Sequence, residues 1–282
     1  MKCAWQAYLN LLPHWLRPEV DRYGKETLQE LHMRLGHCPI MSLSSGDWKL
    51  DRIVTTEDIS FVINAASEYS PWAATTLRKG YLTGQGGHRI GVCGIATVSG
   101  GVMQGITRPT ALCIRVARDF ENISAKVAEI CESILIIGPP ASGKTTLLRD
   151  LIRKKSNTGT GNISVVDERE ELFPTHKGQA CFYAGEHTDI ISGCSKSDGI
   201  EAVLRTMNPS WIAVDEITEK KDCDALLQTG WCGVRLMATA HAGTVQDLLT
   251  RPIYKPLIEN KLFSYVLVLR KDKSWTLERM YL

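Results

Sequence analysis

Eight consecutive residues of this chain could bind a phosphate chain: positions 138–145 read GPPASGKT and match G-x-x-x-x-G-K-[ST]. Backbone N–H groups of such a loop point at phosphate oxygens, and the following helix adds the positive end of its dipole. Lys144 is then expected to reach the β- and γ-phosphates, and the Thr145 hydroxyl to bind Mg²⁺. The residues expected to hold the nucleotide are Gly138, Pro139, Pro140, Ala141, Ser142, Gly143, Lys144, Thr145 and Thr146. The pattern predicts a nucleoside triphosphate site with Mg²⁺.

A second run of residues supplies the acids that this chemistry needs. Trp211 to Val214 are apolar and are followed by Asp215 and Glu216. An acid that emerges from a buried strand beside the loop can hold the hydration shell of Mg²⁺, a role predicted for Asp215. Glu216 is then placed to orient or deprotonate an attacking water. Many strands end in an acid for structural reasons alone, but the phosphate-binding pattern upstream favours a hydrolytic site.

Further polar residues at expected strand ends could complete this site. Glu168 could share the activation of water with Glu216, or it could pair with the adjacent Arg169. His241 follows another expected strand, where it could sense the γ-phosphate or serve only in capping and packing. Thr239 is a weaker candidate. Because ligands of parallel sheets bind at the carboxyl ends of the strands, these residues are expected to lie together.

A fifty-residue stretch, Tyr69 to Arg118, contains no acidic residue. Its basic residues are Arg78, Lys79, Arg89, Arg108, Arg115 and Arg118. A window of one sign is expected to face something negative, either nucleic acid or the phosphates of a nucleotide across a domain cleft, unless it is simply solvated. Phosphoryl transfer to water commonly uses an arginine from another domain or subunit. Arg115 and Arg118 are the first candidates for that role, followed by Arg89 and Arg108.

The elements that must position these residues form two expected domains, 1–119 and 120–282, since 282 residues suffice for two cores. The first is an α+β domain with a strand pair near 27–35, a helix over 55–66 and glycine-rich strands over 80–98 and 111–118. In the second, a helix over 122–131 precedes expected strands at 133–137, 163–167, 211–215 and 235–240 and a hairpin of 261–270 with 275–280. Alternating helices and strands predict an α/β domain with a mostly parallel sheet.

Composition is typical of a soluble globular protein, with 44% hydrophobic and 23% charged residues. No apolar run approaches the roughly 18–20 residues that span a bilayer. Nine cysteines without a C-x-x-C pair or zinc-finger spacing favour reduced thiols in a cytosolic protein and predict no structural metal. The first twenty residues favour an amphipathic helix rather than a secretory signal. Its apolar side chains, Trp5, Tyr8, Leu9, Leu12 and Trp15, either pack in the core or contact a partner or membrane surface.

Several motifs together resemble those of the secretion-type hexameric ATPases of type II and type IV secretion and pilus retraction. The chain is most similar to the stage III sporulation protein AA family of endospore-forming bacteria. The matching segments are ELHMRLGHCP, GGHRIGVCGIA, ITRPTALCIRVAR, GPPASGKTTLLRDL, VVDERE, MNPSWIAVDEI and ATAHAG. Two features depart from the wider pattern: there is no four-cysteine zinc module, and Glu170 replaces the usual glycine after the VVDER-like run.

This resemblance implies a RecA-like P-loop ATPase domain behind a smaller α+β domain, with ATP and Mg²⁺ as cofactors. It assigns the Walker roles to Lys144, Thr145, Asp215 and Glu216, an acidic-box role to Glu168, a histidine-box role to His241 and phosphate contacts to Arg89, Arg115 and Arg118. It also implies a hexameric ring at the cytoplasmic face of a membrane, with channel proteins as partners and no transmembrane segment of its own. The expected function is ATP hydrolysis that powers or assembles a channel during sporulation.

Three other functions compete with this interpretation. A RecA-like motor on nucleic acid agrees with the basic window but is less favoured. A nucleotide-gated assembly scaffold with slow turnover is opposed by the intact pair Asp215 and Glu216. An ATP-binding-cassette subunit is opposed by the run Ser192 to Ser195, which is a poor match to the signature of that class.

Overall fold

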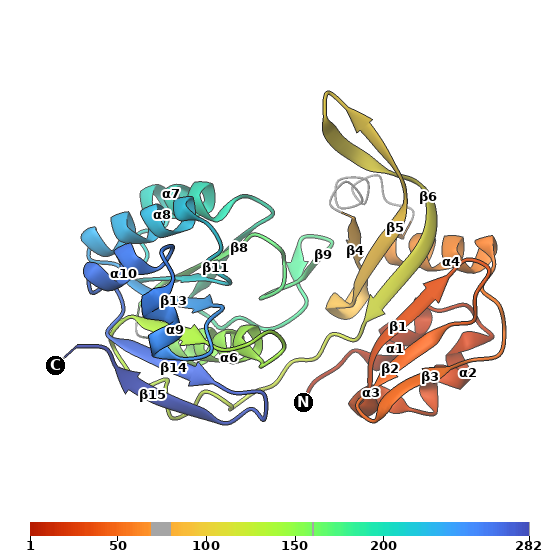
Figure 1. Cartoon of the computed structure of the whole chain (residues 1–282), viewed down its shortest axis with the longest axis horizontal. Coiled ribbons are helices and arrows are strands. Elements are labelled where there is room, and N and C mark those ends of the chain that lie inside the picture. The colour runs from red at the N-terminus through yellow and green to blue at the C-terminus, as the bar shows by residue number, and fades with distance from the viewer. Residues whose placement is uncertain (69–79, 160, 282) are drawn as a thin grey trace. The chain divides into compact units, whose positions relative to one another are not determined.

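The computed structural model describes residues 1–68, 80–159 and 161–281 and divides into two compact units (Figure 1). The first unit comprises Met1–Asp119 and Pro174–Phe182, and the second comprises Phe120–Phe173 and Tyr183–Leu282. The basic residues Arg78 and Lys79 lie outside the described residues. Across the described part of the chain, no helix combines the length and hydrophobicity needed to cross a bilayer.

The first unit is built on a six-stranded antiparallel sheet of order β3-β2-β1-β6-β5-β4. Its strands are β1 (Leu28–Arg34), β2 (Ile40–Leu43), β3 (Gly46–Lys49), β4 (Tyr81–Thr83), β5 (Arg89–Ser99) and β6 (Val102–Arg115). Side chains of a strand alternate between faces, so Leu31 and Met33 of β1 enter the core while Glu30 and His32 lie on the opposite face. The predicted strand pair and glycine-rich strands are confirmed.

Short helices complete the first unit: α1 (Trp5–Asn10), α2 (Leu16–Asp21), α3 (Gly24–Thr27), α4 (Thr56–Ser67) and the 3₁₀ turn η1 (Gln85–Gly87). The expected N-terminal helix is interrupted around Pro13, whose ring is incompatible with a helix interior. Its apolar face nevertheless packs in the core, where Tyr8 and Leu12 are fully buried. Helix α4 begins as predicted, with a capping box between Thr55 and Asp58.

The second unit contains a seven-stranded sheet of order β11-β8-β12-β13-β7-β14-β15, parallel except for the β14–β15 pair. The strands are β7 (Ile134–Ile137), β8 (Ile163–Asp167), β11 (Thr188–Ser192), β12 (Trp211–Val214), β13 (Arg235–Ala240), β14 (Tyr265–Leu269) and β15 (Trp275–Arg279). The predicted strands and terminal hairpin are confirmed. Strand β11 and the small pair β9 (Thr175–His176) and β10 (Gln179–Ala180) were not anticipated from the sequence.

Helices cover both faces of this sheet. Helices α7 (Lys196–Thr206), α8 (Lys220–Trp231), α9 (Val245–Thr250) and α10 (Lys255–Glu259) bury their apolar residues against one set of alternating strand positions, including Leu135 and Ile137. Helix α6 (Lys144–Asn157) contacts β7 and β13 and buries Leu148 and Ile152, which lie outside that cluster. Because the strands are parallel, their carboxyl ends lie at one common edge of the sheet, and α6 and α7 begin there.

The predicted helix over 122–131 is wrong, because this segment forms turns instead. Asp150 of α6 is buried, and its carboxylate accepts hydrogen bonds from the backbone N–H of Asn122 at 3.0 Å and of Ser124 at 2.8 Å. The Ser124 hydroxyl donates to the same carboxylate at 2.7 Å. Asn122 also has left-handed backbone with a φ of 66°, and the carbonyls of Ala128 and Ile130 accept hydrogen bonds from Lys155 of α6, so tertiary contacts override the local pattern.

Candidate active site

The loop between β7 and α6 has a shape that only its own glycines permit. All four residues of β7 are buried, so the loop emerges from a rigid base. A Cβ atom on Gly138 would lie 2.5 Å from the carbonyl oxygen of Leu269, which leaves no room for a side chain. Gly143 has a φ of +102°, a left-handed conformation that glycine adopts without penalty. Both glycines of the predicted pattern are therefore fixed by backbone geometry.

Lys144 is buried at the start of α6, where its ammonium is held by neutral groups only. It donates to the carbonyl oxygens of Gly138 and Pro139, both at 3.0 Å, and to Nδ1 of His241 at 3.2 Å. Among the described residues it forms no ion pair with a carboxylate. Burial lowers the pKa of Lys144, and the charges of Asp215 and Glu216 only oppose this shift. Burying a cation without a counterion is costly, and an anion that enters open space beside it offsets that cost.

Asp215 lies at the end of β12 and is held by two hydroxyl groups. Thr145 donates to its Oδ2 at 2.7 Å, and Thr239 of β13 donates to its Oδ1 at 2.5 Å. The Thr239 hydroxyl also accepts the backbone N–H of Glu216 at 2.7 Å. A hydroxyl beside a carboxylate is the hard oxygen donor set that Mg²⁺ prefers. Thr239 is the group that fixes both acids of this strand end.

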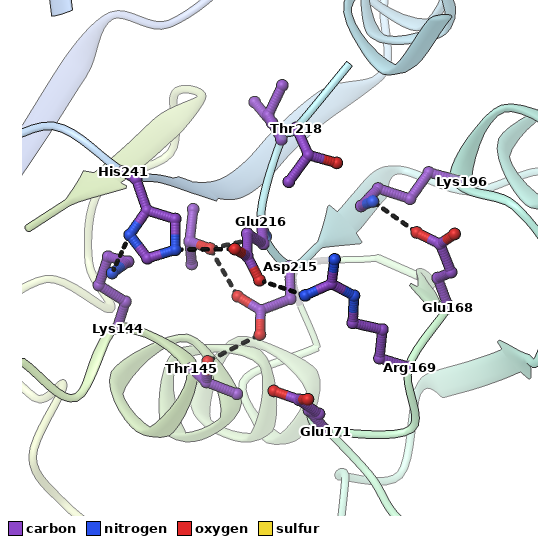
Figure 2. Close-up of polar contacts among 12 residues, drawn as sticks. Lys144, Thr145, Glu168, Arg169, Glu171, Lys196, Asp215, Glu216, Thr218 and His241 are labelled. Carbon is purple, nitrogen blue, oxygen red and sulfur yellow. Dashed lines mark hydrogen bonds and ion pairs between the residues drawn. The ribbon is translucent and has the colours of Figure 1, made fainter. Parts of the chain in front are cut away.

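Glu216 lies in a chain of polar contacts that runs from Lys144 through His241 to Glu216 and on to Arg169 (Figure 2). Its Oε1 lies 2.7 Å from Nε2 of His241, and its Oε2 accepts from Arg169 at 2.9 Å. Because an ammonium can only donate, Nδ1 of His241 is the acceptor, so the proton of the neutral ring resides on Nε2 and is donated to Glu216. Glu216 also has a φ of 55°, a left-handed backbone conformation that is uncommon for a non-glycine residue.

Glu168 pairs with a lysine that the sequence did not single out. Its Oε2 lies 2.6 Å from Nζ of Lys196, the first residue of α7, which also lies 3.4 Å from the carboxylate of Asp222. Glu168, Asp215 and Glu216 line one small pocket, into which Lys196 also projects. Ser195 caps α7 and so fixes the start of the helix, but a single lysine after a cap carries no recognisable motif.

A cavity of about 630 Å³, within the range of small-molecule sites, lies beside the loop. The predicted loop residues from Pro140 to Thr146 form one wall, together with Asp215, Glu216, Thr239 and His241. Gly138 and Pro139 contribute their carbonyls to Lys144 instead. The lining residues that sequence reasoning missed are Phe120, Ile123, Leu147, Glu171, Leu269, Lys273 and Trp275. Lys273 of the β14–β15 turn donates to the Ala141 carbonyl at 2.6 Å.

The residues fit a nucleoside triphosphate with Mg²⁺. Among the described residues, the loop holds a buried ammonium without a counterion, a glycine cradle that a Cβ would fill, and a buried hydroxyl, Ser142 Oγ, without a hydrogen-bond partner. Thr145 and Asp215 supply the oxygen donors for the metal, and Lys144 supplies the charge for phosphate.

The predicted arginines belong to the first unit and are not among the residues that line this cavity. Arg89 and Arg115 lie directly opposite each other on β5 and β6. Arg115 is 58% exposed and pairs with Glu30 at 2.8 Å, and the guanidinium of Arg89 lies 4.1 Å from the ring centre of Tyr81. Arg118 donates to the carbonyl oxygens of Lys25 and Leu28, so its guanidinium is engaged within its own unit.

Comparison with known proteins agrees with this fold. Two solved structures have the same fold: the ATPase DotB of Legionella pneumophila, with a TM-score of 0.61 at 17% identity over 95% of this chain and 80% of that one, and the pilus retraction motor PilT with bound ADP, with a TM-score of 0.61 at 17% identity over 89% and 76%. The predicted fold, a RecA-like domain behind an α+β domain, is confirmed.

Sequence relatives define the family. Stage III sporulation protein AA of Bacillus subtilis (strain 168) is 36% identical over 231 residues, which are 78% of this chain and 75% of that protein. The family model described as "Sporulation stage III, protein AA" matches residues 9–280. The chain therefore belongs to the sporulation stage III protein AA family.

Proposed function

We propose that this chain binds ATP and Mg²⁺ in the cavity of the second unit and hydrolyses the nucleotide. The observation that carries this proposal is the buried Lys144 ammonium, held by carbonyls and an imidazole beside the Thr145–Asp215 pair. ATP with its metal supplies a phosphoanhydride bond and the charge that polarises it. Lys144 and the loop N–H groups hold the phosphates, and Thr145 and Asp215 hold the metal.

Glu216 is the proposed acceptor of the proton from water, with Glu168 as a second carboxylate in the adjoining pocket. In the structure both oxygens of Glu216 are engaged, one by His241 and the other by Arg169. His241 is in turn engaged by Lys144. When Lys144 turns to an anion, Nδ1 of His241 loses its donor and the ring is released to reorient. His241 thus connects occupancy of the site to the freedom of Glu216.

The positive charge that completes the site comes, in this proposal, from the arginines of the first unit, in the same or a neighbouring subunit. Arg89 is better suited than Arg118, because Arg118 donates to two backbone carbonyls; Arg115 is exposed but would have to leave its ion pair with Glu30. A contribution from a neighbouring subunit requires a ring, and we propose the hexamer that secretion-type ATPases form. Its partners are proteins of a membrane-associated channel that the ring powers or assembles from the cytoplasmic side during sporulation.

The test compares ATP hydrolysis and nucleotide binding in the full chain and in Glu216→Gln. Loss of a positioned base typically costs 10²–10⁴-fold in rate, so we expect hydrolysis to fall by about that factor while ATP affinity changes little. Glu201→Gln, an exposed acid-to-amide change on α7, is the matched control. Hydrolysis by Glu216→Gln at the control rate would remove Glu216 from the mechanism. Tight binding without turnover in the unaltered chain, at every protein concentration, would favour the scaffold.

A further inference from the structure

Three potential metal ligands converge on the exposed face of the first unit's sheet. Glu30 and His32 are alternate residues of β1, and Cys113 lies on β6 directly opposite His32. The intervening residues, Leu31 and Ile114, are fully buried on the other face. The three side chains are only partly buried, so that solvent reaches them. Because Cys113 is some eighty residues from the other two, linear spacing of the sequence does not reveal the group.

The distances within this trio match those of a tetrahedral zinc site. Cys113 Sγ lies 3.6 Å from Glu30 Oε2 and 3.9 Å from His32 Nε2, and the last two atoms are 3.3 Å apart. Bonds of about 2.3 Å to sulfur and about 2.0 Å to nitrogen and oxygen place tetrahedral ligand atoms about 3.5 Å, 3.5 Å and 3.3 Å apart, respectively. One ion can therefore contact all three atoms after adjustments of a few tenths of an ångström.

The geometry differs from that of a catalytic thiol. In a cysteine nucleophile with its base, the carboxylate orients the histidine through the ring nitrogen that does not face the sulfur. Here Cys113 and Glu30 both contact Nε2 of His32. The three ligand atoms therefore lie within 3.9 Å of one another and do not form a relay.

Two neighbouring residues keep the three ligand atoms oriented and accessible. Arg115 donates from Nε to Oε1 of Glu30 at 2.8 Å, which fixes the carboxylate with Oε2 toward His32 and Cys113. Outer hydrogen bonds of this kind orient metal ligands. On the other side of Cys113, its partner on β5 is Gly91, which has no side chain to cover the thiol.

We propose that Glu30, His32 and Cys113 bind one divalent metal ion, with zinc preferred and water as the fourth ligand. Thiolate and imidazole select a borderline-soft ion over Mg²⁺. The thiolate and the carboxylate together balance its two positive charges, and the thiol proton passes to solvent on binding. The ion would tie β1 to β6, the two central strands of the sheet, independently of any nucleotide in the second unit.

The test titrates the metal-free full chain with Co²⁺ in the absence of nucleotide and follows absorption. We expect one equivalent to produce a thiolate-to-cobalt charge-transfer band and the intense visible bands of tetrahedral cobalt, and one equivalent of Zn²⁺ to abolish them. The absence of a thiolate band in the unaltered chain would overturn the proposal. Since nucleotide is omitted, this result stands apart from the outcome for ATP hydrolysis.

Variants identify the ligands. Cys113→Ser and His32→Gln should each lose the charge-transfer band. The control variants Cys232→Ser and His37→Gln, which change exposed residues, should keep it. Bands of equal strength in Cys113→Ser and Cys232→Ser would overturn the assignment. Circular dichroism of the metal-free variants establishes folding. If Cys113→Ser does not fold, His32→Gln carries the test, with Zn²⁺ expected to raise the Tm of the unaltered chain but not that of this variant.

Discussion

Two buried lysines at the same edge of the second unit's sheet differ in what compensates their charge. Lys144 and Lys196 are the first residues of α6 and α7, and they are 7% and 3% exposed. Lys196 lies between the carboxylates of Glu168 and Asp222, whereas Lys144 contacts two carbonyls and an imidazole. Both ammonium groups are buried, but among the residues that the structure describes only Lys196 pairs with carboxylates. The comparison separates a lysine with an internal structural ion pair from the lysine that we propose binds phosphate.

A third lysine shows that carbonyl acceptors around a buried ammonium do not by themselves mark a ligand site. Lys155, near the end of α6, donates to the carbonyls of Ala128 and Ile130, and burial lowers its pKa to about 8. The ring of Trp211 covers its ammonium, with the ring centre 4.4 Å from Nζ. Lys144 instead lines the cavity of about 630 Å³. An anion site therefore needs open space beside the cation as well as carbonyl acceptors around it.

The strongest test of this contrast is Lys144→Met, which keeps much of the side chain's length and removes its charge. If the ammonium awaits phosphate, we expect ATP hydrolysis to be abolished and ATP affinity to fall by about 100-fold, since a charge-assisted contact to phosphate contributes about 3 kcal/mol. The free energy of unfolding should stay the same or rise, because a desolvated charge is removed. Calorimetric binding and urea unfolding measure the two effects, with the exposed Lys220→Met as control. A variant that binds ATP normally would contradict the comparison.

Lys196→Met should have the opposite signature. It leaves Asp222, which is 2% exposed, and Glu168 without their counterion, and breaking a buried ion pair in this way costs about 3–5 kcal/mol. We expect the urea midpoint to fall accordingly, with the m-value unchanged. ATP affinity should fall less than in Lys144→Met. If Lys196→Met and Lys220→Met were equally stable, the ion pairs of Lys196 with Glu168 and Asp222 would not stabilise α7.

The parts of the site that the sequence predicts are those with a local pattern. The strand before Gly138, the glycine loop and the helix after it are consecutive, as are the apolar run of β12 and its two acids. Alternating strands and helices then place the acids at one edge of a parallel sheet, because the carboxyl ends of parallel strands meet there. The patterns predict an α/β domain with a mostly parallel sheet, whereas the RecA-like fold was implied by the resemblance to the family.

Side-chain partners could not be predicted, because they depend on tertiary packing. Lys144 meets His241 across 97 positions of the sequence, and Glu168 meets Lys196 across 28. Neither contact leaves a local signal. The failed helix over 122–131 has the same cause, since the capture of its backbone by Asp150 is a tertiary event.

Asp167, at the end of β8, is a buried carboxylate to which the same comparison applies. Its ionisation should change the free energy of unfolding less than Lys196→Met does. It is held by the backbone N–H groups of Glu171 at 2.9 Å and Phe173 at 2.8 Å. Burial raises its pKa to about 6, although these hydrogen bonds oppose the shift. The folded state therefore binds more protons than the unfolded state between about pH 4 and pH 6, and the free energy of unfolding falls as pH rises through this window.

The size of that loss follows from the pKa difference: about two units correspond to about 3 kcal/mol at most. Carboxylates with lowered pKa values change stability in the opposite direction, so the measurement is a difference between proteins. Urea unfolding at several pH values between 4 and 7 should show the unaltered chain losing stability relative to Asp167→Asn, whose amide does not ionise. The exposed Asp224→Asn serves as control. Parallel profiles for Asp167→Asn and the unaltered chain would mean that this carboxylate is solvated. Asp167 would then not carry an unfavourable buried charge as Lys144 does. The contrast between Lys144, held by neutral groups, and Lys196, paired with carboxylates, would in that case apply to the lysines alone.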